Sequence, residues 1–239
     1  QLFLRIVDAL DKGGYKFDMG ADGKPGLIVN AADYGAAQSR NRLILRAVKK
    51  GELPKIPEKT GPSDWYELLR DLIEAPAPIA ASGKYWRDAV VGPNELWRIN
   101  NWIKSGRLDP NLPIITMGHS NFKGQPLAAN AGGPAPTLVS SRAAVPRILL
   151  PGGKFSKVVG EAERMTFSGE VIRVTPEMHN RLMGMPKWFV ENLQANNKAR
   201  GLTPSESRLQ IKEVEGNGIH GDTTRNFLRP MISGEGGKT

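Results

Sequence analysis

The chain contains no cysteine among its 239 residues, and this absence excludes several kinds of chemistry. Disulfide bonds, thiolate metal ligands and a cysteine nucleophile cannot come from this sequence. The lack of cysteine is compatible with a cytoplasmic protein. No apolar run approaches the length of about 18 residues that a transmembrane helix needs, and no signal peptide is visible. The sequence therefore predicts no membrane partner.

Histidine is scarce, and its spacing excludes another class of site. The three histidines lie far apart and lack metal-ligand spacing, so we predict no metal site at His119, His179 or His220. Hydrophobic residues make up 39% of the chain, which permits a core of moderate size. The 27 glycines and 18 prolines indicate many turns and loops. The first residue is glutamine rather than methionine, which leads us to expect a fragment or a processed chain.

Acidic residues are outnumbered by basic ones. The formal net charge is +9 and the isoelectric point is near 9.8. Such an excess favours polyanions, because lysine and arginine neutralise phosphates and release counterions. An acidic membrane surface is the alternative, but no basic amphipathic helix stands out. The charge therefore favours nucleic acid as the partner.

Hydrophobic periodicity and capping residues predict a mixture of helices and short strands. The predicted helices span residues 2–12, 65–73 with Ser63 or Asp64 as cap, 93–105, 176–183 and, more weakly, 223–232. The predicted strands span residues 27–31 and 43–48, with shorter β-like runs at 114–117, 137–139 and 147–150. Residues 49–63 read as a break, and residues 194–208 as a loop or a short helix.

The loop between the first two predicted strands carries Gln38, Arg40 and Arg42. If the extended geometry of the following strand reaches back to them, Arg40 and Arg42 point to the same side. Two guanidinium forks so placed could hold a phosphate and a base edge together, and the Gln38 amide could bond a base or brace the loop. The alternative interpretation is a solvated basic loop lying over the hairpin.

The string from Asn30 to Arg42, N-A-A-D-Y-G-A-A-Q-S-R-N-R, resembles the eighth motif of the DNA (cytosine-5)-methyltransferases. Three further segments resemble blocks of the same family in its order. They are the P-A-P-T-L segment at 134–138, a ninth-motif block running from Arg173 to Phe189, and Gly216-Asn217 as the tenth motif. Together they identify the chain as a member of that family.

The resemblance implies a reaction in which the target cytosine is flipped out of double-stranded DNA. In this family a cysteine thiolate attacks C6 of the base, and C5 takes a methyl group from S-adenosylmethionine. The resemblance places Arg42 at the flipped cytosine, and Arg40 and Gln38 beside it, where they hold the loop. It places Gly216 and Asn217 beside the methyl donor, although the stretch after them departs from the family's small apolar pattern.

The region between these motifs would read the DNA target. Its candidate contacts to phosphates or the major groove are Arg87, Lys104, Arg107, Lys123 and Arg142. We interpret the tryptophans at positions 65, 86, 97 and 102 as core residues rather than base-stacking groups. In the ninth motif, Arg173 and Glu177 could pair and join their helix to the recognition domain, which is an architectural role.

The expected fold is α/β: the C-terminal part of a doubly wound methyltransferase domain that uses S-adenosylmethionine, with a small mixed α+β target recognition domain. The expected domains are residues 1–50, the tail of the catalytic domain; 51–150, target recognition; 151–215, the remainder of the small domain; and 216–239, the return to the catalytic domain.

The family's Pro-Cys nucleophile is absent from this sequence, so we expect the isolated chain to be inactive. A missing N-terminal half would supply this cysteine and cover an exposed sheet edge. That half could also be a separate subunit of a split enzyme. The alternative is a DNA-binding module without a catalytic role, in which Arg40 and Arg42 only grip phosphate.

Overall fold

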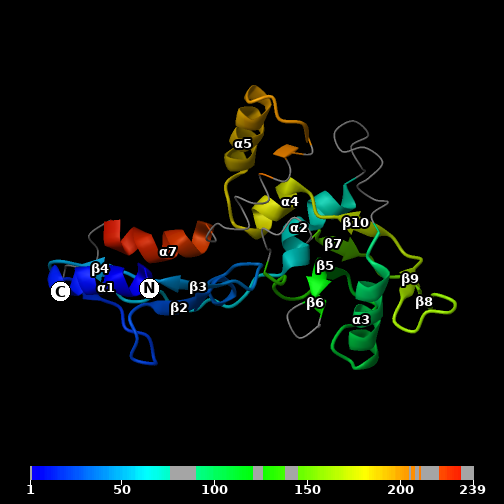
Figure 1. Cartoon of the computed structure of the whole chain (residues 1–239), viewed down its shortest axis with the longest axis horizontal. Helices are drawn as coiled ribbons and strands as arrows, with labels where there is room; N and C mark the ends of the chain where they lie inside the picture. Colours follow the sequence, from blue (N-terminus) through cyan, green and yellow to red (C-terminus); the bar gives the residue numbers. More distant parts are fainter. Residues whose placement is uncertain are drawn as a thin grey trace.

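The helices and strands fall into two groups that lie beside one another (Figure 1). The computed structural model describes residues 2–75, 90–120, 126–137, 145–204, 206–207, 210 and 221–232. The first group contains α1 (Leu2–Lys12), the strands β1 to β4, and the last helix, α7 (Gly221–Ile232). The second group contains α2 to α5 and the strands β5 to β10. The chain therefore leaves the first group and returns to it at the end.

Two antiparallel strand pairs form the first group. β2 (Leu27–Asn30) pairs with β3 (Asn41–Ile44), and β1 (Lys16–Phe17) pairs with β4 (Ala47–Val48). The sequence predicted one strand over residues 43–48, but the structure divides it into β3 and β4. The division falls at Arg46, whose carbonyl accepts a hydrogen bond from Asp18 N and whose side chain pairs with the Asp18 carboxylate.

The small core of the first group lies between the β2–β3 pair and α7. Phe227 of α7 is buried and meets the ring of Tyr34 edge-on, with the ring centroids 5.0 Å apart. Val29 completes this cluster, with Leu27 and Ile44 packed at its border. The predicted C-terminal helix is thus confirmed, and its packing places it on the strand pair that carries the candidate motif.

A four-stranded antiparallel sheet with the order β10-β7-β5-β6 forms the centre of the second group. Its strands are β5 (Ile114–Ser120), β6 (Pro126–Asn130), β7 (Arg147–Leu149) and β10 (Val171–Arg173). Alternate residues face opposite sides, as strand geometry requires. Ile115, Ile148 and Ile172 pack in one core cluster, whereas Ile114, Leu149 and Val171 pack in the other.

Helices cover both faces of this sheet. The cluster on one face includes residues of α2 (Trp65–Glu74) and α4 (Pro176–Leu182), with Trp65 fully buried. The other cluster joins α3 (Pro93–Lys104) to the hairpin of β8 (Phe155–Lys157) and β9 (Met165–Phe167), and Trp97 and Trp102 pack against it. The prediction that tryptophans 65, 97 and 102 are core residues is confirmed, and Trp86 lies outside the described residues.

Helix boundaries follow the predicted capping residues. Asp64 accepts a hydrogen bond from Tyr66 N at the start of α2, and Thr175 accepts one from Met178 N at the start of α4. Gly106 and Gly184 follow α3 and α4 with φ angles of 72° and 60°, a conformation that favours glycine. The predicted helices at 2–12, 93–105 and 176–183 are confirmed.

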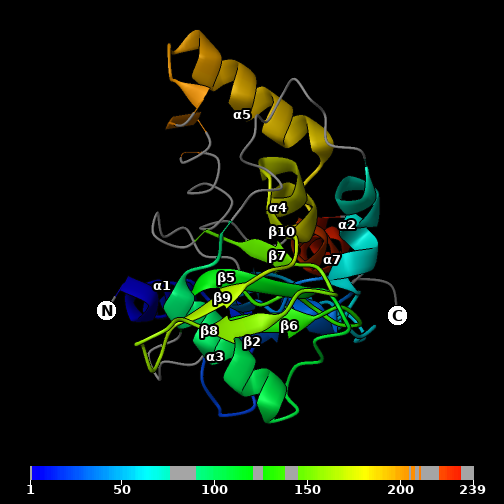
Figure 2. The same ribbon diagram turned by 90° about the vertical axis from the view of Figure 1, so that its right-hand side faces the viewer.

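α5 (Lys187–Ala199) was not predicted, because Gly184 and Pro186 were read as the end of helical structure. Pro186 instead precedes α5, which projects from α4 away from the sheet (Figure 2). The strands β1, β6, β8, β9 and β10 were also missed. Mixed α/β structure is confirmed, but every strand pair among the described residues is antiparallel, so a doubly wound sheet stays a prediction. Among the described helices, none has the length and apolarity to span a bilayer.

Candidate functional site

Asn30, at the end of β2, closes the loop that leads to Arg40. Its Oδ1 accepts hydrogen bonds from the backbone N of Ala32 (3.2 Å) and of Arg40 (2.8 Å), and its Nδ2 donates to Ser39 Oγ (3.3 Å). The Arg40 carbonyl also accepts from Ala31 N at 2.9 Å. One asparagine therefore holds both ends of the loop. The sequence alone assigned it no role, although an asparagine where a strand ends and a turn begins is a known loop-closing signal.

Gln38 and Arg40 are both buried in this loop, with exposed fractions of 0% and 1%. Neither amide atom of Gln38 has a hydrogen-bond partner within the described part of the chain. An unpaired buried amide costs free energy, on the order of 1–3 kcal/mol. Such an arrangement is typical of a site that a ligand completes.

The Arg40 guanidinium sits in a strongly desolvated position. Burial, together with the nearby positive charge of Arg42, lowers the pKa of Arg40 to about 10. Arg40 is therefore still protonated at neutral pH. Its charge is held in a region of low dielectric, where it acts more strongly on a neighbouring group than a solvated cation does.

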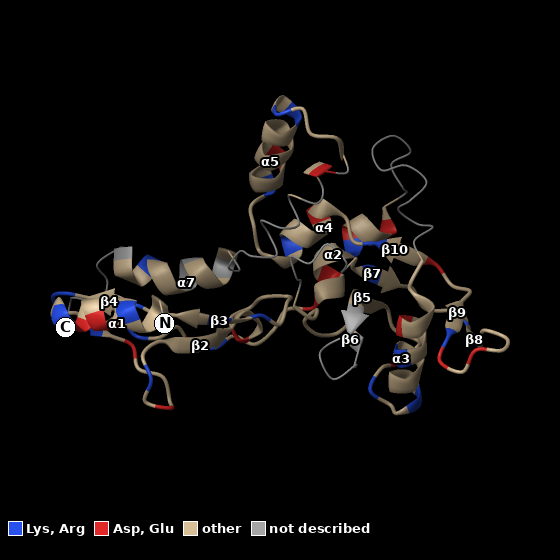
Figure 3. Ribbon diagram, in the orientation of Figure 1, with Lys and Arg blue, Asp and Glu red and all other residues tan. Residues whose placement is uncertain are grey.

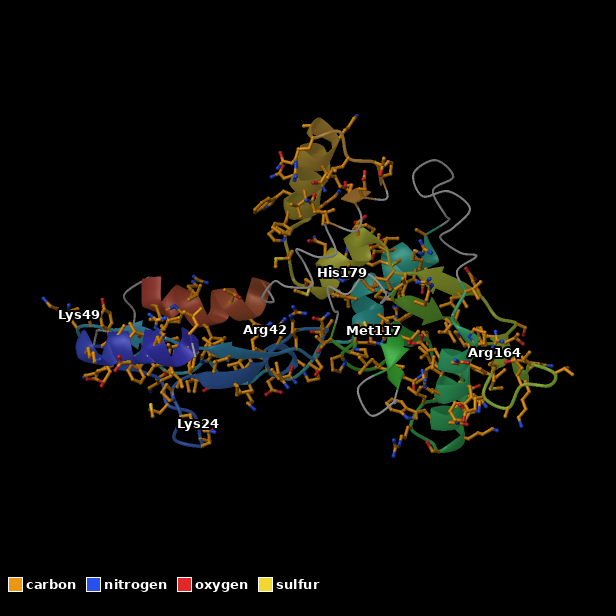
Figure 4. The ribbon with its side chains drawn as sticks, in the orientation of Figure 1. Lys24, Arg42, Lys49, Met117, Arg164 and His179 are labelled. Atoms are coloured by element: carbon orange, nitrogen blue, oxygen red, sulfur yellow. The ribbon has the colours of Figure 1, made fainter. Side chains whose placement is uncertain are left out.

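Arg42 lies within β3, opposite Val29, and its side chain is partly exposed. Its Nη1 donates to the carbonyl of Asn41 at 2.8 Å, which leaves the other guanidinium nitrogens for a ligand. In Figure 4, Arg42 lies at the end of the first group nearest to the second. Arg40 lies just before β3, and the two charges are close enough for Arg42 to lower the pKa of Arg40. One buried and one partly exposed cation therefore lie near each other.

The P-A-P-T segment lies directly against this loop. Ala135 N donates to Ala37 O, and Ser39 N donates to Ala135 O, each at 2.8 Å. Gln38 and Ala135 form a parallel bridge, and Thr137 Oγ1 donates to Ser39 O. Two segments almost a hundred residues apart in sequence are thus joined backbone to backbone. The loop is fixed by the second group as well as by its own strands.

Residues 60–65 hold the other side of the loop. Gly35 N donates to Gly61 O (3.0 Å), and Ser63 N donates to Ala36 O (3.2 Å). Trp65 N, at the start of α2, donates to Gly133 O at 3.0 Å. The end of the segment predicted to be a break is therefore hydrogen-bonded to the loop, and it leads directly into α2.

The other predicted site residues do not gather at this loop. Lys104 and Arg107 are exposed at the C-terminal end of α3, where the Arg107 guanidinium carbon lies 5.7 Å from the Trp102 ring centroid.

Glu177 pairs with Arg181 of its own helix at 3.3 Å, so the predicted Arg173–Glu177 pair is wrong. Arg181 lies one helical turn from Glu177 and pairs with it, whereas Arg173 lies in the preceding strand β10. Within the described ranges, no group of acidic or histidine side chains could hold a metal. Arg87, Lys123, Arg142, Gly216, Asn217 and His220 lie outside the described residues.

Comparison with known proteins decides the family. The model of the C-5 cytosine-specific DNA methylase family matches residues 1–201. The chain belongs to this family. C-5 cytosine-specific methylases use S-adenosylmethionine as the methyl donor and act on DNA, so the resemblance drawn from the motifs is confirmed at the level of the family.

Two relatives of this methylase family are named as type II enzymes. The chain is 38% identical over 76 residues to the type II methyltransferase M.XorII of Xanthomonas oryzae pv. oryzae. The aligned segment covers 31% of this chain and 17% of that relative. The chain is also 29% identical over 100 residues to the type II methylase M.HgiDII of Herpetosiphon aurantiacus. That alignment covers 42% of this chain and 26% of the relative. The matched part therefore spans about a quarter or less of each relative's length.

Proposed function

We propose that this chain supplies the part of a DNA cytosine-5 methyltransferase that completes the pocket for an extruded cytosine and contacts the target DNA. The observation that carries the proposal is the closeness of buried Arg40, on a loop fixed by Asn30 and Ala135, to the partly exposed Arg42 at the start of β3. The cysteine nucleophile, absent from these 239 residues, comes from another part of the enzyme.

Arg42 is suited to the carbonyl oxygen of a flipped pyrimidine. Attack on C6 pushes electrons toward that oxygen, and a fixed cation stabilises the charge that develops there. Arg40 is too buried to be a main contact, so its role is to hold the loop and to add positive potential behind Arg42. The unpaired Gln38 amide is suited to a base edge or a backbone group of the extruded nucleotide.

The burial of the loop argues against the simpler interpretation of a solvated basic loop. A loop of that kind would expose its cations and satisfy its amides with water. Here Arg40 and Gln38 are enclosed, and the buried Gln38 amide has no partner among the described residues, which supports a built site. The second group, which fixes this loop through Ala135, is then the part that recognises the DNA target.

Exposed apolar side chains on the first group support the proposal that another part of the enzyme packs against it. No residue of α1 is buried, although the helix is amphipathic, and Leu2 and Leu4 are 72% and 67% exposed. On the β2–β3 pair, the face opposite α7 exposes the cross-strand pair Ile28 and Leu43. We propose that the half that carries the cysteine, on the same or a separate polypeptide, packs here. The methyl donor would bind mainly to that half, with Gly216 and Asn217 beside it.

A second candidate is a DNA-binding module without catalysis, which the net charge of +9 and the absence of cysteine favour. In Figure 3, basic residues occur on both groups with acidic residues among them, an arrangement compatible with binding along a duplex. The names of the two relatives favour a modification enzyme of a restriction system over this candidate.

A complementation assay separates the two candidates. The isolated chain, given labelled methyl donor and duplex DNA, should show no turnover, and an added N-terminal half carrying Pro-Cys should restore it. In the restored enzyme, Arg42→Ala should lower turnover by about 100-fold, as loss of one charge-stabilising donor does. Its effect on DNA affinity should be much smaller.

Lys24→Ala is the matched control, because Lys24 is an exposed cation of the first group that lies outside α1 and pairs with Asp22. Turnover by the isolated chain, or equal losses of turnover and DNA affinity in Arg42→Ala, would overturn the proposed function.

A further inference from the structure

Two arginines face each other across neighbouring strands of the second group. Arg147 of β7 and Arg173 of β10 are direct register partners, and β7 and β10 lie side by side in the sheet (Figure 1). Like charges placed opposite one another destabilise a sheet. A β-sheet that keeps such a pair needs a compensating charge, from within the protein or from a ligand.

The residues that the structure describes supply part of that compensation. Glu95 of α3 is the one acidic group that favours the charged form of Arg147, whereas burial and the charge of Arg173 together lower the pKa of Arg147 to about 10. Glu95 also accepts a hydrogen bond from Thr116, the β5 partner of Arg147. Among the described residues, one carboxylate thus acts on the two guanidinium groups.

Hydrogen bonding shows which nitrogens remain for a ligand. Arg147 Nη1 donates to the carbonyls of Val145 (2.8 Å) and Pro146 (3.3 Å), so this side chain is anchored. The Nε atoms of both arginines are buried without a hydrogen-bond partner among the described residues. Both side chains are nevertheless only partly buried. Part of each residue therefore reaches solvent, while its Nε atom lacks a hydrogen-bond partner among the described residues.

We infer that Arg147 and Arg173 together bind one phosphate of the DNA backbone, at a second contact separate from the cytosine-binding loop. Two neighbouring guanidinium groups match the tetrahedral oxygens of a phosphate, which both can contact at once. The inference rests on the proposed function, because the duplex is what would bring a phosphate to this sheet. Neither residue was singled out as a DNA contact by the sequence, since each looks like an ordinary strand cation.

The experiment measures binding of the full chain to duplex DNA over a range of salt concentrations. Each phosphate contact contributes a slope of about −0.9 to log affinity against log salt. We expect Arg173→Met, which keeps the aliphatic stem, to reduce the magnitude of this slope by about 1 for any sequence. Arg147→Met should do the same. The double variant should lose no more than one contact, because the two residues share one phosphate.

Lys12→Met in the first group is the control for loss of a charge, and it should leave the slope unchanged. A second measurement is thermal unfolding without DNA, in which Arg173→Met should not lower the melting temperature, because it relieves the like-charge pair. Addition of inorganic phosphate should stabilise the wild type more than this variant only if a free anion also binds.

Unchanged slopes in Arg147→Met and Arg173→Met, or additive losses in the double variant, would overturn the shared phosphate. These results are independent of the methylation assay. Loss of turnover in Arg42→Ala together with unchanged slopes here would leave the proposed function standing without this contact. Reduced slopes without any restored methylation would keep the contact and remove the proposed function.

Discussion

Arg46 and Asp18 form a two-point salt bridge inside the first group, with Arg46 Nε 2.7 Å from Asp18 Oδ2 and Nη2 2.9 Å from Oδ1. Both side chains are almost fully buried. The Arg46 guanidinium carbon also lies 5.8 Å from the Phe227 ring centroid. The pair thus connects the segment after β1, the break between β3 and β4, and helix α7. It therefore fixes the end of the strand that carries Arg42.

Asp18→Asn should destabilise the protein by about 3–5 kcal/mol, because it leaves the Arg46 charge buried without its counter-charge. The matched control is Asp22→Asn, since Asp22 pairs with Lys24 on the same connection but in an exposed position. That change should have little effect. Chemical denaturation of both variants measures the difference. Equal stability of the two would show that the buried pair contributes nothing specific.

Asn30→Ala should lower both stability and restored methylation, because the backbone N–H groups of Ala32 and Arg40 lose their acceptor. A loss of about 1–2 kcal/mol is typical when a capping side chain is removed. Asn30→Asp keeps the acceptor oxygen and loses only the donor to Ser39, so it should recover most of the loss. Should Asn30→Asp be as damaging as Asn30→Ala, the acceptor role would be wrong.

Local signals predicted the helices well, because their start and stop residues act through neighbouring atoms. Asp64, Thr175 and Gly106 each act within one turn of their own helix. The hairpin of β8 and β9 has three-residue strands and offers too short a pattern to recognise. α5 was missed for a different reason, since a proline can precede a helix as readily as end one.

The candidate site was predictable only in part. The sequence placed Gln38, Arg40 and Arg42 on one loop, but it could not show that Arg40 is buried and Arg42 accessible. That difference depends on segments at 60–63 and 133–137, which reach the loop only in the folded chain. The Arg147–Arg173 pair depends likewise on strand register, which no local pattern fixes.

The Arg181–Asp71 salt bridge, with Nη1 and Oδ1 2.6 Å apart, should give stability a small dependence on pH. The hydrogen bond from Arg181 lowers the pKa of Asp71 below its usual value of 3.8. A carboxylate whose pKa is lowered by folding stabilises the protein above its unfolded pKa, and this contribution is lost as the pH falls through the folded pKa. Because Asp71 is largely exposed, the contribution should stay below about 1 kcal/mol.

Asp71→Asn tests this dependence. The variant should be slightly less stable than the wild type near neutral pH, and the two should converge as the pH falls below about 4. Denaturation curves at several pH values measure the difference. A difference that is constant with pH would mean that Asp71 acts through packing rather than through its charge.

The exposed apolar face of the first group should behave as an interface rather than as a core. Leu4→Lys and Ile28→Thr change side chains that are 67% and 73% exposed, so each should alter the stability of the isolated chain by no more than about 0.5 kcal/mol. Both should nevertheless weaken association with an N-terminal half that carries Pro-Cys, because they remove apolar surface that the partner would bury.

Val159→Thr is the control, since Val159 is 98% exposed on the second group, away from that face. Titration calorimetry with the N-terminal half would detect the difference. If all three variants bind equally well, the partner packs elsewhere, and the apolar face of α1 has another explanation.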